Sequence, residues 1–514
     1  MKELTTSIYT FEDLINGNFL YVDKTEYIWQ LIKPAKEMYF LSRPRRFGKS
    51  LTVSTLKAVF EGKKELFKGL AIYNKPYDWK THPVIHLDMN GRDFSTLEKM
   101  EDSFRQILLE QAELNGVPLK ESSSDTMFHK LIKKLHDTKG DVVILLDEYD
   151  KPILNNISKP GCHDFLDALK IFYSVIKEKN AMIRLAFITG VSKFCHVSLF
   201  SELNNLTDIT MDVRFATMLG YTQEEMEANF SDRLDALAGD HDELMQEIKR
   251  WYNGYRFHHN APTVYNPVSL AQFFKSGGEF NNYWFSTGTP TFLLELMKKQ
   301  RFDLEKALNS PVSSLAFDAY EIDRLNPLTL LLQTGYLTID SAVNRFGRTA
   351  YRLRFPNLEV KDSFETYLAG YCSGLFADQV KDSVYQLADA VTIGDVDGFM
   401  ETMKVFFAKV PYDVHLKDEN NFQLLFFSIF MLLGISITAE SKTNQGRIDA
   451  VATNEDFVFV FEFKLDKSKE MALEQIKDRD YYRRYMNSGK KIILIGVNFD
   501  MEKGQIQDWT SQTV

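Results

Sequence analysis

Four short apolar runs, separated by segments with helical periodicity, constrain the fold of this chain more strongly than any other feature of its sequence. They are "MYFL", "PVIHLDM", "DVVILLDEYD" and "IRLAFITGVS", which begin at Met38, Pro83, Asp141 and Ile183. Strands that are buried on both faces read as continuous apolar runs, and their alternation with helices is typical of βαβ units. The pattern therefore predicts a parallel sheet covered by helices on both faces.

The patterning changes twice along the 514 residues, which exceed what one hydrophobic core normally serves. Short helices and turns begin after residue 216, and they lead into a helix followed by two strands, which suggests a winged-helix-like module. From about residue 381 the signals are helical, then a long apolar helix, then strands at 447–452, 457–464 and 491–497. We therefore predict an α/β domain over 1–216, a mostly helical and winged-helix-like region over 217–380, and a small α/β domain over 381–514.

Charge and composition narrow the class of protein. The net charge of −10 argues against a surface coated with nucleic-acid-binding residues, although a local basic groove is not excluded. The three cysteines have no metal-site spacing and the N-terminus has no apolar signal core, so we expect a cytoplasmic protein. Gly434 divides the uncharged run 420–439, which favours a buried helix followed by a core strand, "ISIT", over a membrane span.

The loop after the first apolar run reads "RPRRFGKS" (Arg43–Ser50) and is similar to a phosphate-binding loop that lacks its first glycine. In the pattern G-x-x-x-x-G-K-[ST], Gly48 allows close approach, Lys49 reaches the β- and γ-phosphates, and Ser50 can ligate Mg²⁺. Arginine side chains would supplement the backbone donors. An arginine-rich surface turn before an ordinary helix would give the same letters, so the loop alone does not decide.

A second motif strengthens the nucleotide hypothesis. The third apolar run ends in Asp147, which can hold Mg²⁺, and Glu148, which can orient or deprotonate an attacking water. A core strand that happens to end in acidic residues is the alternative, but two motifs in the right order make chance less credible. Thr189 and Ser192 follow the next run and can sense the γ-phosphate, although capping of a turn explains them equally well. The predicted nucleotide contacts are Arg43, Arg45, Arg46, Phe47, Gly48, Lys49, Ser50, Leu51, Asp147, Thr189 and Ser192, with Ser50 and Asp147 as metal ligands and Glu148 as a catalytic group.

The C-terminal strands carry a second constellation. Glu462 and Lys464 share one face of the strand "FVFVFEFK", and Asp449 can lie beside them if the strands pair as a hairpin. Two converging carboxylates bind a divalent cation, and Lys464 can activate a metal-bound water to attack a phosphodiester. An exposed strand edge with alternating charge is the alternative. This strand is too apolar for an exposed position, so its charged pair requires a buried partner or a metal.

At this point the motifs resemble known families. The strings "YVDKTEYIWQLI…YFLSRPRRFGKSLTVSTL", "LLDEYDKPI" and "YNGYRF…VYNPVSL" resemble a bacterial family described as AAA-ATPase-like, related to P-loop ATPases of mobile elements, over roughly residues 5 to 300. In that family "RPRRFGKS" is the usual form of the loop. The resemblance implies a P-loop NTPase sheet, nucleotide binding at Lys49 and Ser50, and a Walker-B role for Asp147 and Glu148.

The C-terminal constellation resembles the PD-(D/E)xK nuclease motif over about residues 400 to 500. By this resemblance Asp449, Glu462 and Lys464 take the three signature roles. Glu419 fits the acidic residue on the first helix of such nucleases, and Gln475 fits the polar residue on the helix after the core strands.

We therefore expect an ATP-dependent enzyme that acts on nucleic acid, with DNA the favoured substrate, and that uses ATP and Mg²⁺ or Mn²⁺. The resemblance suggests mobile-element or defence biology, and assembly into a homo-oligomer is left open. Nucleic acid would contact the basic stretch "KDRDYYRRYMNSGKK" or the winged-helix-like region. The alternative is a nucleotide-dependent switch or scaffold whose C-terminal domain binds nucleic acid without cutting it. A small-molecule kinase would leave the C-terminal constellation unexplained.

Overall fold

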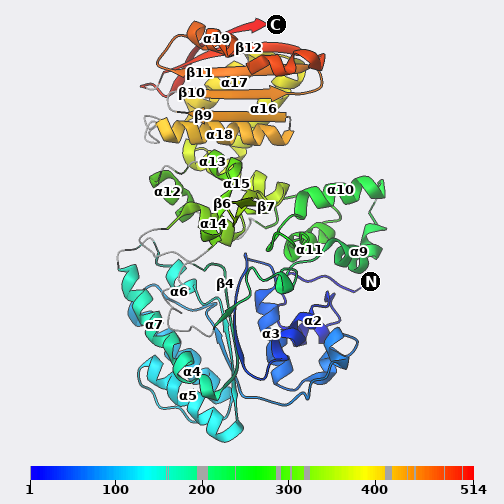
Figure 1. The fold of residues 1–514 in the computed structure, drawn as a ribbon, viewed down its shortest axis with the longest axis vertical. Coiled ribbons are helices and arrows are strands. Elements are labelled where there is room, and N and C mark those ends of the chain that lie inside the picture. The colour runs from blue at the N-terminus through cyan, green and yellow to red at the C-terminus, as the bar shows by residue number, and fades with distance from the viewer. Residues whose placement is uncertain are drawn as a thin grey trace. The chain divides into compact units, whose positions relative to one another are not determined.

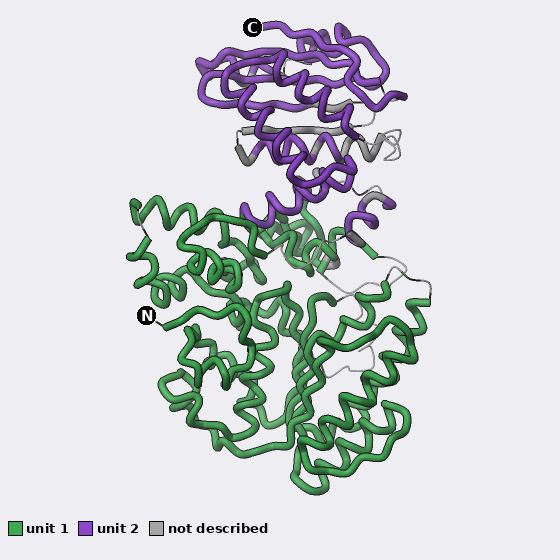
Figure 2. The backbone as a smooth tube through the Cα atoms, turned by 180° about the vertical axis from the view of Figure 1, so that it is seen from behind, with its two compact units in different colours: residues 1–284, 311–357 green, residues 285–310, 358–514 purple. Residues whose placement is uncertain are grey.

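In the computed structural model the chain forms two compact units (Figure 2), which are described separately. Unit 1 comprises residues 1–284 and 311–357, and unit 2 comprises residues 285–310 and 358–514. The structure describes residues 2–157, 159, 161–193, 206–237, 239–284, 291–300, 302, 304–317, 325–410, 419–436, 438–444, 447–479, 481–500 and 502–514, and in places only their backbone. The division into three domains at residues 216 and 380 stays a prediction.

The N-terminal sheet has the strand order β2-β3-β4-β1-β5, and all its pairings are parallel. Its strands are β1 (Glu37–Ser42), β2 (Val84–Asp88), β3 (Val142–Asp147), β4 (Ile183–Gly190) and β5 (Thr207–Asp208). The first four coincide with the four apolar runs, so the predicted parallel sheet is confirmed. Every position of β3 is buried, because helices cover both faces.

Among the described residues, five helices cover this sheet. Figure 1 shows α4, α5 and α7 on one side of it and α2 and α3 on the other. The ring of Phe172 stacks on Phe104 at 4.3 Å and on Phe128 at 5.1 Å between centroids, which joins the first three helices into one layer. Their bounds are α2 (Thr25–Ile32), α3 (Lys49–Phe60), α4 (Leu97–Leu114), α5 (Ser124–Lys139) and α7 (Cys162–Glu178), with the short helices α1 (Phe11–Asn16) and α6 (Lys151–Leu154) beside them.

The rest of unit 1 is a helical group and a small sheet. The helices α9 (Gln223–Leu234), α10 (His241–Tyr252) and α11 (Pro267–Lys275) share a core that includes Phe230, Tyr252 and Phe273. Helix α14 (Pro327–Thr334) ends at Gly335, whose φ of 90° closes it. The strands β6 (Val312–Ser313), β7 (Thr338–Arg345) and β8 (Arg348–Arg354) then form an antiparallel sheet of order β6-β8-β7. The predicted helix followed by two strands is therefore α14, β7 and β8.

Unit 2 is built on a second five-stranded sheet, of order β13-β12-β11-β10-β9. Only the β11–β12 pairing is parallel among the pairings described. Its strands are β9 (Thr438–Asn444), β10 (Arg447–Thr453), β11 (Phe457–Leu465), β12 (Lys491–Asp500) and β13 (Gln505–Thr513). Its helices are α12 (Thr291–Lys299), α13 (Leu304–Asn309), α15 (Leu358–Ser373), α16 (Ala377–Ile393), α17 (Val396–Lys409), α18 (Glu419–Ser436) and α19 (Lys469–Asp478).

Two details of this unit differ from the prediction. Helix α18 continues through Gly434 to Ser436, and the next strand is Thr438–Asn444 rather than "ISIT". The edge strand β13 was not predicted either. Both edge strands are polar in sequence, so they lack the apolar alternation that indicates a strand. Within the part of the chain that is described, no helix has both the length and the apolar character to cross a membrane.

Candidate functional sites

The loop between β1 and α3 has the backbone of an anion-binding turn. Gly48 has a φ of 94° directly before the first residue of α3, and Arg46 has a φ of 66°. A Cβ added at Gly48 would meet no atom within 4 Å, so the backbone is open to approach there. The N-terminus of α3 contributes a positive partial charge beside the backbone N–H groups of this turn, which favours an anion. This geometry fits the predicted role of Gly48.

Lys49 lies buried in the loop, with 5% of its surface exposed. Its Nζ donates to the carbonyl oxygens of Arg43 and Pro44, at 3.1 Å each. Burial lowers the pKa of Lys49, and the nearby carboxylates of Glu148 and Asp147 oppose that shift. The amine is therefore held between the loop and the acidic end of β3.

Ser50 and Asp147 meet where the loop adjoins β3. The hydroxyl of Ser50 hydrogen-bonds the carboxylate of Asp147, which is 2% exposed. Burial raises the pKa of Asp147 to about 6, against the opposing effects of Ser50 and Lys49. A hydroxyl beside a carboxylate is the donor set that holds Mg²⁺ next to nucleotide phosphates. The residues present therefore fit a magnesium–nucleotide complex.

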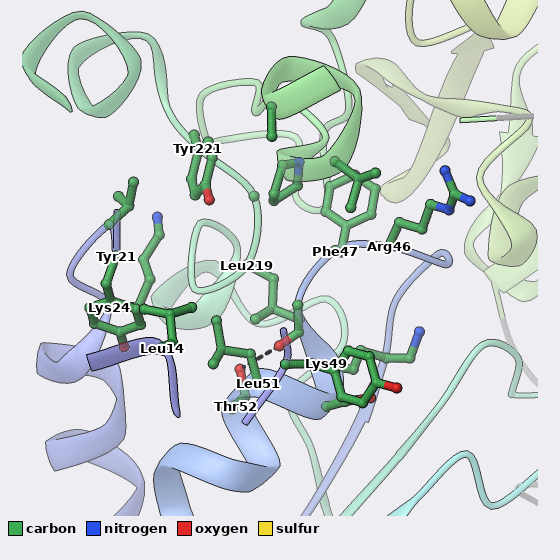
Figure 3. A pocket seen from close by; sticks show the side chains of 18 of the residues that line it. Leu14, Tyr21, Lys24, Arg46, Phe47, Lys49, Leu51, Thr52, Leu219 and Tyr221 are labelled. Atoms are coloured by element: carbon green, nitrogen blue, oxygen red, sulfur yellow. Dashed lines mark hydrogen bonds between the residues drawn. The ribbon is translucent and has the colours of Figure 1, made fainter. Parts of the chain in front are cut away.

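A cavity of about 400 Å³ opens beside the loop (Figure 3). Its volume lies in the range of small-molecule sites. Figure 3 shows Tyr21, Lys24 and Tyr221 across the cavity from Lys49. Seven residues predicted from the sequence line it, namely Arg46, Phe47, Gly48, Lys49, Ser50, Leu51 and Glu148. The remaining lining comes from the N-terminal segment with α2, from α3, from residues 218–221, and from α9 and α11.

The three arginines of the loop take different positions, and only Arg46 lines the cavity. The guanidinium of Arg43, 1% exposed, donates to the carbonyls of Ser42 (2.9 Å), Thr210 (2.6 Å) and Phe215 (3.3 Å), so it braces the loop and does not line the cavity. The guanidinium of Arg46 donates to the carbonyl of Tyr283 at 2.9 Å, although Arg46 does line the cavity. Arg45 is exposed and does not line it.

The two predicted γ-phosphate sensors also lie outside the cavity lining. The hydroxyl of Ser192 donates to Asp150 Oδ2 at 2.6 Å, and its backbone N–H donates to the same oxygen at 2.7 Å. Thr189 is fully buried, and its hydroxyl has no hydrogen-bond partner within the described structure. Sequence reasoning missed Asp150, the last acidic residue of "LLDEYD", which fixes the turn after β4.

The segment "YNGYRF" (Tyr252–Phe257) supports the loop from behind, and sequence reasoning gave it no role of its own. The ring of Phe47 packs edge-on against Tyr255 at 4.8 Å and Phe257 at 5.4 Å between centroids. The guanidinium of Arg43 lies 4.0 Å from the centre of the Phe257 ring. The segment therefore fixes both ends of the nucleotide loop.

The same segment contacts the β7–β8 hairpin on its other side. Gly254 has a φ of 129°, and a Cβ there would lie 1.8 Å from the carbonyl oxygen of Pro356. Arg354 donates to the Gly254 carbonyl at 3.1 Å, and Arg256 N–H donates to Thr338 Oγ1 at 2.8 Å. We call residues 252–257 the bracket, because they join the loop to the small sheet within unit 1.

The C-terminal hairpin has the register that the sequence required. Asp449 of β10 is the antiparallel partner of Glu462 of β11, so the two positions belong to one face of the sheet. Glu462 is fully buried and Lys464 is 8% exposed. Lys464 Nζ lies 3.1 Å from Glu462 Oε1, so the charged pair sits inside an otherwise apolar strand.

Alternation along β11 shows which helix covers that pair. Phe461 packs against Phe399 of α17, at 4.8 Å between ring centroids, whereas Val458 and Val460 share a core with Ile476 of α19. Successive side chains of a strand point to opposite faces, so Glu462 and Lys464 belong to the α19 face.

Helix α19 approaches this face closely at Gly496, the β12 partner of Glu462. A Cβ at Gly496 would lie 2.3 Å from the Lys469 carbonyl oxygen and 2.6 Å from the Leu473 nitrogen, so only glycine admits the helix. Gln475 lies on this helix, and its side-chain nitrogen is buried without a hydrogen-bond partner in the described structure. Gln475 is therefore on the predicted helix, with an amide available to a ligand.

Two of the predicted nuclease residues are described only in part. Glu419 begins α18 and Asp449 lies in β10, but their side chains lie outside the described residues. Among the side chains that are described, no three histidines, cysteines or acidic residues form a metal-binding group. A buried carboxylate beside a buried ammonium, opposite a second acidic position, fits a divalent cation by the chemistry of its donors.

Comparison with known proteins covers both sites. Residues 5–200 match the AAA-ATPase-like family, described as a predicted AAA-ATPase, and residues 417–509 match the PD-(D/E)XK nuclease superfamily. The "Uncharacterized protein in vnfD 5'region" of Azotobacter chroococcum mcd 1 is 37% identical over 517 residues, which cover 98% of each chain.

Two solved structures of the Aeropyrum pernix ORC2 protein are also similar. Its ADPNP–ADP complexes match with a TM-score of 0.33 and 12% identity, over 70% of this chain and 92% of that one. Its ADP form matches with a TM-score of 0.30 and 12% identity, over 68% and 90%.

Proposed function

Because the chain belongs to the AAA-ATPase-like family and carries a PD-(D/E)XK nuclease superfamily domain, we propose that it is an ATP-dependent nuclease that requires a divalent metal. The observation that carries the nuclease part is the buried Glu462–Lys464 pair, directly across the ladder from position 449. Burying a charged pair inside an apolar strand costs stability, so its presence supports a role in binding or catalysis. We take DNA as the substrate.

The first site supports the use of ATP. The loop amides and Lys49 would hold the phosphates, and Ser50 with Asp147 would hold Mg²⁺, which offsets the phosphate charge. Glu148 follows Asp147 with a φ of 54° and lines the cavity, and it would orient the water that attacks the terminal phosphate.

At the second site Asp449 and Glu462 would hold Mg²⁺ or Mn²⁺, and the cation would supply positive charge beside the scissile phosphate. The ammonium of Lys464, which lies 3.1 Å from Glu462, would orient the attacking water. Glu419 and Gln475 would support the cation and the water. Binding of ATP at the loop would govern this cleavage.

The test is a cleavage assay with the full chain, plasmid DNA and Mn²⁺ or Mg²⁺, with and without ATP. We expect Asp449→Ala to cut about 10²–10³-fold more slowly than the wild type, because a metal ligand is lost. Lys49→Ala should cut at a rate that no longer responds to ATP. The matched control is Asp456→Ala, an exposed carboxylate between β10 and β11, which should behave as the wild type.

Wild-type cleavage rates in Asp449→Ala would contradict the nuclease assignment. If the wild type cuts neither duplex nor single-stranded DNA but still binds ATP, the result supports the nucleotide-dependent switch instead.

A further inference from the structure

The turn that joins β7 to β8 exposes a large aromatic side chain. Arg345 and Arg348 are the last paired residues of the hairpin, so Phe346 and Gly347 alone form its turn. Phe346 is 104% exposed, which means that its ring contacts no other part of the described structure appreciably. Folding therefore gains nothing from burying this ring.

The backbone of this turn makes the choice of phenylalanine more unusual. The φ angles of Phe346 and Gly347 are 52° and 77°, both positive, as a type I′ turn requires. Asparagine, aspartate and glycine suit the first position of such a turn, whereas a bulky residue is strained there. Strain together with full exposure indicates a residue kept for a purpose other than folding.

The flanking charges point to the partner. Two arginines oppose each other across the ladder at the turn, an arrangement that destabilises a hairpin. Between Thr338 and Arg354 there are four arginines and one acidic residue, in a chain whose net charge is −10. Arg354 donates hydrogen bonds to the carbonyls of Gly254 and Pro356. The other three, Arg345, Arg348 and Arg352, are exposed and form no ion pair in the described structure. A polyanion would relieve their mutual repulsion.

We propose that this tip, Arg345–Arg348, is a contact for duplex DNA. The ring of Phe346 enters the minor groove as a wedge at a base step, while Arg345 and Arg348 contact the phosphates on either side. A turn of two residues is narrow enough for the minor groove of B-form DNA, about 6 Å wide. The minor groove of A-form RNA is wide and shallow and gives a wedge no walls, so DNA is the partner that fits.

The proposal deepens the proposed function, since it shares the premise that the chain acts on DNA, but it does not require cleavage. Binding is therefore measured in EDTA, where the metal-dependent site is silent. A chain that binds DNA through the tip and never cuts it would contradict the nuclease and leave this proposal standing.

The experiment is fluorescence anisotropy with the full chain and a labelled duplex over a series of salt concentrations. Phe346→Asn should bind about tenfold more weakly at every salt concentration, because an uncharged wedge is lost. Arg345→Gln/Arg348→Gln should also bind more weakly, and the slope of log K against log[salt] should fall by about 2, since two phosphate contacts are lost. Thermal unfolding of Phe346→Asn should occur at the wild-type temperature or above, which separates lost binding from lost folding.

Matched controls lie elsewhere on the surface. Phe376→Asn removes a ring that is 78% exposed, and Arg105→Gln/Arg250→Gln removes two charges distant from the hairpin in sequence. Both should bind as the wild type. Unchanged affinity and salt slope in the two tip variants would overturn the proposal. It would also be overturned if those variants bound DNA normally but changed the mass of the protein in light scattering, because the tip would then be a contact between protein chains.

Discussion

The two candidate sites both place a buried lysine beside carboxylates, but they hold it differently. Lys49 lies at the start of a helix, and its Nζ donates to two backbone carbonyls of its own loop. Lys464 lies within a strand, and its Nζ contacts the carboxylate of Glu462 two residues away. The first amine bonds neutral carbonyls, which a phosphate oxygen would replace, whereas the second is paired with a carboxylate on the same face of a sheet. We expect the first site to respond to its ligand and the second to be preorganised.

The largest expected effect breaks the first site alone. Lys49→Ala should lower ATP turnover by about 10²–10³-fold, because a buried cation that would face the transferred phosphate is lost. Lys57→Ala, on the exposed side of the same helix, is the matched control. The measurement is phosphate release, with metal-dependent DNA cleavage in the absence of ATP as the second readout. If phosphate release and ATP-independent cleavage fell together, the two lysines would serve one site, which would contradict the distinction drawn between them.

The second-largest expected effect concerns the ionisation of the buried Asp147 carboxyl near Lys49. Burial raises the pKa of Asp147 from 3.8 to about 6, so the folded chain binds this proton more tightly than the unfolded chain does. Stability is therefore lost as the pH rises through this window, by up to about 3 kcal/mol at neutral pH. Asp147→Asn cannot ionise, so it should raise the thermal unfolding temperature near pH 7 and give no gain below about pH 4.

The same variant should weaken magnesium-dependent ATP binding, because a candidate ligand for the cation is lost. The control is Asp167→Asn, an exposed carboxyl, which should change neither property. Equal unfolding temperatures of wild type and Asp147→Asn at both pH values would mean that burial does not destabilise this carboxylate.

The sequence predicts those parts of each site that depend on local pattern, and it does not predict contacts between distant residues. Period-two alternation and apolar runs gave the parallel sheet and the pairing of Asp449 with Glu462, because both depend on local pattern. Two of the three carbonyls that Arg43 contacts belong to positions 210 and 215, and the side-chain partner of Ser192 is Asp150. No pattern within a short window encodes contacts over such separations. The motif therefore indicated which residues form the loop, but not which of their side chains are already occupied.

Substituting one glycine beside each site tests whether the two sites can be impaired separately. Gly496→Ala would place a Cβ 2.3 Å from a backbone oxygen of α19, so the helix must move, at a cost of about 1–3 kcal/mol. Gly48→Ala has open space, but its φ of 94° would strain alanine by about 1–2 kcal/mol. The first should impair DNA cleavage and spare ATP binding, and the second should weaken ATP binding and spare the cleavage that is measured without ATP. Paired assays of both activities on each variant check this, and loss of both activities in either one would contradict it.

The smallest effect tests whether the bracket holds the nucleotide loop in place. Phe257→Leu keeps an apolar side chain but removes the ring that lies 4.0 Å from the Arg43 guanidinium. The lost cation–π contact is worth about 1 kcal/mol, so ATP affinity should fall about fivefold as the loop becomes less well fixed. Phe128→Leu, an aromatic of α5 that stacks on Phe172 and does not line the cavity, is the control. Because the bracket also contacts the β7–β8 hairpin, DNA binding that depends on ATP in the wild type and not in Phe257→Leu would identify it as the link between the two. Unchanged ATP affinity would show that the carbonyl contacts of Arg43 fix the loop without the ring.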